Sequence, residues 1–188
     1  MGEKLKIVFA DDESCCRELA GAALDVAMAG VPGVDVEVTD TNDGVFAFEH
    51  VMGHGADLLI SDVGMPRLSG PESVARIFEN SGSERMVPYV AFVTGGVSAC
   101  SDKELLARLV EDPRVLGILP KPVTPDSVAA LLRIVSVRKG LVGAGVLPKE
   151  FAIDDAVESV RARTVQACTS WDIPFNPGLG SNFSRNCK

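Results

Sequence analysis

Short apolar strands alternate with amphipathic helices along this chain, and that alternation restricts the fold more than any other feature. Five apolar segments are each followed by a helical pattern, with tight turns between them. Because parallel strands need a helical crossover, the alternation favours one parallel sheet with helices on both faces. The predicted strands span residues 4–10, 34–39, 58–62, 89–93 and 115–119. The sequence therefore predicts a doubly wound α/β domain.

Helix signals fill the intervals between these strands. The second helix is predicted to be capped by Thr41 or Asn42, the fourth to begin at a capping box over residues 101–104, and the fifth to be capped by Thr124. The fifth helix presents an apolar face formed by Val128, Leu131, Leu132 and Val135. The face predicted for the first helix consists of Cys15, Leu19, Ala22, Ala23 and Val26.

Composition excludes several classes of protein. The 188 residues suit one domain with an extension, and the net charge of -8 argues against binding to nucleic acid or to anionic membranes. No apolar run reaches the roughly 20 residues of a membrane span. Five cysteines without a regular framework favour a reducing compartment, the cytoplasm. Cys15 and Cys16 are expected to fill a helix face and not to bind metal.

Polar residues follow four of the predicted strands. Asp11 and Asp12 follow the first, Asp62 ends the third, Thr94 follows the fourth and Lys121 follows the fifth. The carboxyl ends of parallel strands lie on one edge, so these side chains are expected to converge. Taken singly, each has an ordinary explanation as a helix cap, a turn residue or a solvated lysine. Their recurrence at successive strand ends favours a shared site.

The residue types at this edge fit phosphoryl chemistry. Clustered carboxylates repel one another and favour a cation, and an all-oxygen set favours Mg²⁺. A hydroxyl and an ammonium group beside them suit the oxygens of a phosphoryl group. Aspartate is able to act as the nucleophile by forming an acyl phosphate.

Over residues 4–138 the chain resembles the receiver domain of two-component response regulators. The resemblance is carried, in family order, by Ile7-Val8-Phe9-Ala10-Asp11-Asp12-Glu13, Asp62-Val63-Gly64-Met65-Pro66, Val93-Thr94-Gly95 and Lys121-Pro122. It implies a flavodoxin-like (βα)5 fold with strand order 2-1-3-4-5. It also implies a signalling phosphoacceptor that is not an enzyme beyond self-phosphorylation and slow autodephosphorylation.

The resemblance also implies roles for the individual residues. Asp62 would receive a phosphoryl group from a sensor histidine kinase or a histidine phosphotransfer protein, and Thr94 and Lys121 would hold its oxygens. Asp12 and Asp62 would bind Mg²⁺ directly, Asp11 through water and Gly64 through its backbone carbonyl. Phosphorylation would then alter the surface of the fourth helix, fifth strand and fifth helix, where a downstream protein would bind.

Some positions depart from the common pattern. Many receivers carry Tyr or Phe where this chain has Ile118, so the aromatic flip associated with the threonine is absent. Pro120 stiffens the loop before the lysine. Gly64 and Gly96 occupy the positions that tune dephosphorylation, and we expect no strong assistance to hydrolysis from them.

Residues 139–188 are predicted to form an extension, with a linker, one helix over 149–170 and an irregular tail. The helix has one face formed by Ile153, Val157, Val160, Thr164 and Ala167. That face is expected to pack on the receiver or on a second copy in a homodimer, and the alternative is docking of a partner. Its charges are balanced, which disfavours DNA binding.

Two alternative functions are weighed against the phosphoacceptor. One is a receiver fragment of a hybrid histidine kinase or larger regulator. The other is a Mg²⁺-dependent phosphohydrolase on a similar sheet. Such hydrolases typically carry a second aspartate two residues after the nucleophile, and Gly64 stands there.

Overall fold

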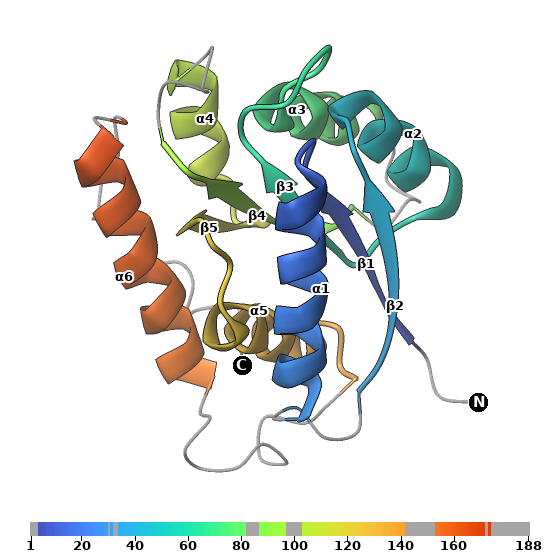
Figure 1. Cartoon of the computed structure of the whole chain (residues 1–188), viewed down its shortest axis with the longest axis vertical. Coiled ribbons are helices and arrows are strands. Elements are labelled where there is room, and N and C mark those ends of the chain that lie inside the picture. Colours follow the sequence, from blue (N-terminus) through green and yellow to red (C-terminus); the bar gives the residue numbers. More distant parts are fainter. Residues whose placement is uncertain are drawn as a thin grey trace.

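A parallel sheet of five strands organises the protein, with helices on both faces and along one edge (Figure 1). The computed structural model describes residues 4–29, 31, 34–81, 87–96, 103–141, 153–171 and 173. The strands, in spatial order, are β2 (Asp35–Thr41), β1 (Lys4–Ala10), β3 (Leu58–Asp62), β4 (Tyr89–Thr94) and β5 (Val115–Pro120). The helices are α1 (Ser14–Ala29), α2 (Gly44–His54), α3 (Gly70–Asn80), α4 (Lys103–Val110), α5 (Pro125–Arg138) and α6 (Ile153–Trp171). The predicted flavodoxin-like fold and its 2-1-3-4-5 order are confirmed.

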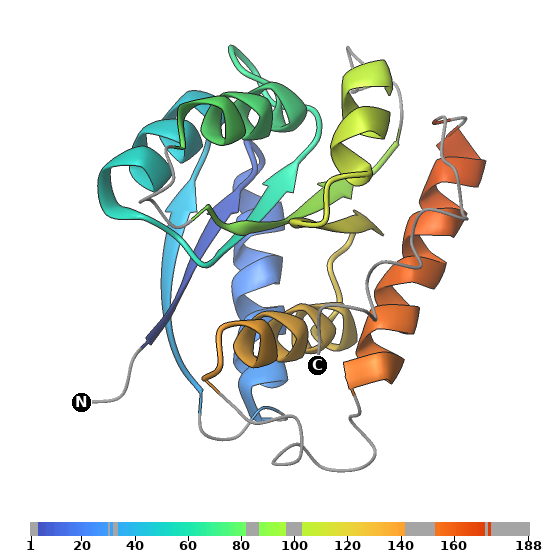
Figure 2. The ribbon, with the colours of Figure 1, turned by 180° about the vertical axis from the view of Figure 1, so that it is seen from behind.

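The sheet is covered by α1 and α5 on one face and by α2, α3 and α4 on the other (Figure 2). Successive side chains of a strand point to opposite faces. Leu58 and Ile60 of β3 therefore join the core with α1 and α5, while Leu59 joins the core with α2, α3 and α4. All of β3 is buried, as the continuous apolar run at residues 58–60 predicts.

The face predicted for the first helix is wrong. Leu19 and Val26 are 55% and 62% exposed. The buried residues of α1 are Ala20, Ala23, Leu24 and Ala27. The true stripe is displaced by one residue, about 100° around the helix. Small alanine side chains face the core because α1 packs closely against α5. The larger Leu19 and Val26 side chains do not fit in this contact and remain exposed.

The helix caps agree with the sequence in part. Thr124 caps α5, as predicted, by accepting a hydrogen bond from the N–H of Ser127. The cap of α2 is Asp43, which accepts from the N–H of Val45 at 2.6 Å, and not Thr41 or Asn42. Thr41 instead ends β2, which begins at Asp35 and continues past its predicted end at residue 39. The capping box predicted over residues 101–104 includes Ser101 and Asp102, which lie outside the described residues.

Helix α6 lies along the edge of the sheet beside β5 and also contacts α5 (Figure 1). Its residues Val160, Thr164 and Ala167 are buried, so the predicted face packs on the rest of this chain. With the sheet, α1 and α6 around it, α5 is buried continuously from Ser127 to Ser136. Residues 149–152 of the predicted helix lie outside the described residues.

Candidate functional site

Asp11, Asp62, Thr94 and Lys121 meet at one edge of the sheet. Asp11 follows the end of β1, Asp62 and Thr94 are the last residues of β3 and β4, and Lys121 follows β5. Asp11, Asp62 and Thr94 are all buried. The parallel topology alone accounts for this convergence, because it places all the carboxyl ends of the strands on the same side.

The Lys121 ammonium group is shared by three carboxylates. Its Nζ lies 2.8 Å from Oδ2 of Asp11, 3.1 Å from Oδ2 of Asp62 and 3.7 Å from Oε2 of Glu13. Burial by itself lowers the pKa of Lys121, but its hydrogen bonds and charge interactions with Asp11 and Asp62 outweigh burial and raise the pKa. Lys121 is therefore a fixed cation at neutral pH, held between two buried carboxylates.

Asp62 is held in an unfavourable environment for its charge. Burial, the largest influence, raises the pKa of its carboxyl group, and the charge of Asp11 adds to the increase. The charge and hydrogen bond of Lys121 and the backbone N–H of Gly64 lower the pKa without cancelling that increase. The folded protein therefore disfavours ionised Asp62, and a further cation nearby would be stabilising.

Replacement Asp62→Asn is expected to raise the free energy of unfolding by about 1 kcal/mol at neutral pH. A carboxyl group whose pKa is raised by folding contributes stability where it is protonated, and that contribution is lost as the pH rises through the folded-state pKa. The advantage of Asp62→Asn should therefore shrink in acid, where the parent carboxyl group is also neutral. Urea unfolding of both proteins at neutral and acidic pH measures this. An equal gain at both pH values would contradict the electrostatic origin.

The Thr94 hydroxyl is bound by the backbone of its own loop. It donates to the carbonyl of Gly96 at 3.0 Å and accepts from the N–H of Gly96 at 3.2 Å. The N–H of Lys121 donates to the carbonyl of Thr94 at 2.9 Å, which joins the loops after β4 and β5. Thr94 thus lies at the predicted edge, with its hydroxyl hydrogen-bonded to Gly96.

Asp11, Asp12 and Asp62 form a cluster of possible metal ligands, with one oxygen from each lying within 4.8 Å of the others. All the donors are carboxylate oxygens, the type that Mg²⁺ prefers. Lys121 supplies one positive charge against these carboxylates, so the residues fit a divalent cation. Gly64 donates its N–H to Asp62, and metal binding by its carbonyl stays a prediction.

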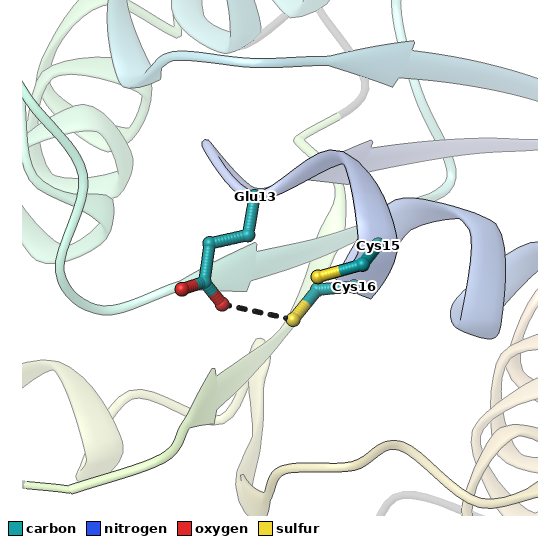
Figure 3. A group of neighbouring side chains, drawn as sticks. All are labelled: Glu13, Cys15 and Cys16. Carbon is teal, nitrogen blue, oxygen red and sulfur yellow. Dashed lines mark hydrogen bonds between the residues drawn. The ribbon is translucent and has the colours of Figure 1, made fainter.

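Glu13 extends the site toward the start of α1 (Figure 3). The Cys16 thiol donates to Oε2 of Glu13 at 3.0 Å, and burial followed by this hydrogen bond raises the pKa of Cys16 to about 12. Ligand atoms of Glu13, Cys15 and Cys16 lie within 4.8 Å of one another, but the raised thiol pKa disfavours the thiolate that a metal needs. Cys15 is exposed and Cys16 is half-buried, so the expectation that Cys15 belongs to the apolar face of this helix is wrong.

The loop after β3 is held by contacts that the sequence pattern does not predict. The N–H of Gly70 donates to the carbonyl of Val63 at 3.2 Å, and Arg67 forms a 2.8 Å ion pair with Asp43, the cap of α2. An added Cβ at Gly70 would lie 2.1 Å from the carbonyl oxygen of Asp62. Gly70 and the Arg67–Asp43 pair therefore help position Asp62, and no local motif indicates contacts between such distant segments.

No protein-family model matches the chain. Among curated proteins, protein-glutamate methylesterase/protein-glutamine glutaminase 2 of Dechloromonas aromatica is 35% identical over 71 residues. That match covers 37% of this chain and 18% of the relative, so it spans less than a fifth of the relative's length.

Solved structures match a larger part of the chain. Chemotaxis response regulator CheY4 of Vibrio cholerae is 26% identical with a TM-score of 0.51, and the match covers 71% of this chain and 99% of that one. A two component transcriptional regulator AraC of Clostridium phytofermentans is also 26% identical with a TM-score of 0.51, covering 70% and 91% of the two chains. With the observed strand order, these likenesses show a response regulator receiver domain, the module of two-component signalling. They do not favour the phosphohydrolase alternative.

Among the helices of the described segments, none combines the length and apolar character needed to span a lipid bilayer.

Proposed function

We propose that this chain is a phosphoacceptor of a two-component or phosphorelay system and that Asp62 receives the phosphoryl group. The observation that carries the proposal is the placement of a buried aspartate at the end of β3, 3.1 Å from the Lys121 ammonium group and beside Asp11. In a receiver fold this edge offers a nucleophile, a fixed cation and a carboxylate cluster within direct contact of one another.

In the proposed reaction a carboxylate oxygen of Asp62 attacks the phosphorus atom of a phosphohistidine. The phosphorus–nitrogen bond breaks, the imidazole nitrogen leaves with the electron pair, and an acyl phosphate forms. Lys121 would hold one phosphoryl oxygen, and Thr94 would exchange its hydrogen bonds with Gly96 for a second. The carboxylates of Asp11, Asp12 and Asp62 with the carbonyl of Gly64 would hold Mg²⁺, whose charge offsets that of the carboxylates and the transferred group.

The proposal extends to the setting of this reaction. The donor would be a cytoplasmic sensor histidine kinase or a histidine phosphotransfer protein. Residues 4–138 would form the receiver and residues 139–188 its extension. The chain would act as a signalling protein and not as a hydrolase, because Gly64 has no side chain to supply an acid or base to the leaving group.

Intact-mass spectrometry after incubation with acetyl phosphate and Mg²⁺ tests the proposed function. We expect the parent to gain one phosphoryl group, Asp62→Asn to gain none, and a metal chelator to abolish the gain. Circular dichroism of Asp62→Asn serves as the control for folding. Failure of the folded parent to gain a phosphoryl group, with Mg²⁺ present, would contradict the proposal.

The phosphoryl group is expected to persist for minutes or longer after the donor is removed. Gly64 and Gly96 lack side chains that position an attacking water, and within the described part of the chain nothing beyond its own neighbours lies within 4 Å of a Cβ added at Gly96. Decay of the intact-mass signal after desalting gives the lifetime. Decay within seconds would show that another group assists hydrolysis.

A further inference from the structure

Helix α6 covers the outer edge of the sheet, where no strand of the described segments pairs with the free side of β5. The N–H of Ile118 in β5 donates to Oγ1 of Thr164 at 3.0 Å, and Thr164 is itself buried. Gly117 permits this close approach, since an added Cβ would lie 2.2 Å from Oγ1 of Thr164 and 3.0 Å from Cγ1 of Val160. The helix therefore hydrogen-bonds to the edge strand in place of a sixth strand.

The two halves of α6 enter different cores. Ala156 and Val160 pack in the core that contains α5, whereas Ala167 and Cys168 pack in the core that contains α4. The helix therefore crosses the edge of the sheet at β5, with its N-terminal half on the α5 side and its C-terminal half on the α4 side (Figure 1, Figure 2). The parts of the α4–β5–α5 surface formed by β5 and α5 are therefore covered by this chain's own helix.

The strand under α6 is also the strand that carries Lys121. Ile118 pairs with Phe92 of β4 and lies three residues before Lys121, whose N–H donates to the carbonyl of Thr94. The hydrogen bond from Ile118 to Thr164 therefore fixes β5 at one point, and the hydrogen bond from Lys121 to Thr94 fixes the chain three residues further on. A change at either point is transmitted through a short, buried segment.

We propose that α6 is a built-in ligand of the α4–β5–α5 surface and that its binding is coupled to the phosphoryl group on Asp62. This inference rests on the proposed function. In this structure α6 is in place and the Thr94 hydroxyl is hydrogen-bonded to Gly96, so Thr94 must break these hydrogen bonds to hold a phosphoryl oxygen. Phosphorylation therefore weakens α6 binding and, because coupling is reciprocal, bound α6 slows phosphorylation.

The contacts of α6 define the partner that this surface fits. A helix that replaces α6 needs a β-branched apolar side chain beside Gly117 and one hydroxyl group to accept from the N–H of Ile118, because Val160 and Thr164 provide these groups now. A phosphorylated chain with α6 released would offer the surface to such a helix.

Cys168 reports on α6 binding in the unaltered protein. Its thiol is 4% exposed, and burial raises its pKa to about 11, so it should react slowly with iodoacetamide while α6 is bound. Peptide mapping measures the alkylation of Cys168 with and without acetyl phosphate and Mg²⁺, and intact mass of the same samples measures phosphoryl gain. We expect alkylation of Cys168 to be at least about 5-fold faster in the phosphorylated protein.

The outcomes separate the two proposals. No phosphoryl gain would overturn the proposed function and this inference with it. Phosphoryl gain with an unchanged rate at Cys168 would overturn the coupling alone and leave the proposed function standing.

Substitutions at Thr164 test whether bound α6 slows phosphorylation. Thr164→Val keeps the shape of the side chain and removes the acceptor for the N–H of Ile118, Thr164→Ser keeps the hydroxyl, and Gln166→Ala changes an exposed position of the same helix. We expect Thr164→Val to be phosphorylated by acetyl phosphate about 5-fold faster than the parent, with Thr164→Ser and Gln166→Ala close to the parent. Equal rates for Thr164→Val and Thr164→Ser would overturn the coupling. The Cys168 measurement needs no variant and decides the question if Thr164→Val does not fold.

Discussion

Replacement Lys121→Met is expected to slow phosphorylation by acetyl phosphate about 100-fold, because one preorganised donor to the transferred group is lost. The Lys121 ammonium group lies 3.1 Å from the carboxylate of Asp62 and is the cation that the described structure places beside that nucleophile. Intact-mass time courses of the parent and the variant give the two rates. Lys6→Met is the matched control, because Lys6 is an exposed residue of β1 whose ammonium group donates to the carbonyl of His54 and not to the carboxylates of the site. Equal slowing by both substitutions would contradict a specific role for Lys121.

Lys121→Met should also lower the free energy of unfolding by about 3 kcal/mol at neutral pH, because it leaves Asp11 and Asp62 buried without their cation. The raised pKa of Lys121 means that its contribution is fully present at neutral pH and is lost only in strong alkali. Added Mg²⁺ should restore part of the loss by binding the same carboxylates. Urea unfolding with and without Mg²⁺ measures both effects. A variant as stable as the parent without Mg²⁺ would show that these carboxylates do not depend on Lys121.

Replacement Gly70→Ala is expected to lower the free energy of unfolding by about 3 kcal/mol. The added Cβ would lie 2.1 Å from the carbonyl oxygen of Asp62 and 2.8 Å from Oγ of Ser61, so the backbone of β3 or the start of α3 must move. Phosphorylation should fall as well, because Asp62 is displaced.

Gly21→Ala provides the control for this prediction. Gly21 is an exposed residue of α1, and apart from the backbone of α1 itself no described atom lies within 4 Å of a Cβ added there. Alanine favours the helix there and should stabilise the protein by up to about 1 kcal/mol. Urea unfolding of the two variants and the parent measures both changes in the free energy of unfolding. A Gly70→Ala variant no less stable than the parent would show that β3 and α3 tolerate the shift.

The convergence of the site was predictable because it depends on topology more than on packing detail. An unbroken apolar strand at 58–60 indicated a strand covered on both faces, and parallel strands place their carboxyl ends together. Asp11, Asp62 and Lys121 meet as expected for that reason. Their roles in phosphoryl transfer stay predictions until they are measured.

Other features depend on contacts between distant segments, which local patterns do not determine. Two apolar stripes fit α1 almost equally well, and only close packing against α5 selects the alanine stripe. The attachment of Arg67 to Asp43 is likewise set by the approach of two loops.

Gly117 is the residue in the sequence that indicates where α6 packs. Gly117 interrupts an otherwise apolar strand, and glycine in a strand often marks the close approach of another segment. The helical face with Val160 and Thr164 was predicted, but the strand that it packs on was not.

Chemical localisation of the phosphoryl group tests the role of Asp62 most directly. Borohydride reduces the acyl phosphate of an aspartate to homoserine and leaves serine and threonine phosphoesters unchanged. After phosphorylation with acetyl phosphate and Mg²⁺, followed by reduction and peptide mapping, we predict homoserine at position 62 and at no other aspartate. Homoserine at Asp11 or Asp12, or a phosphoester on a hydroxyl side chain with Asp62 unchanged, would contradict Asp62 as the acceptor.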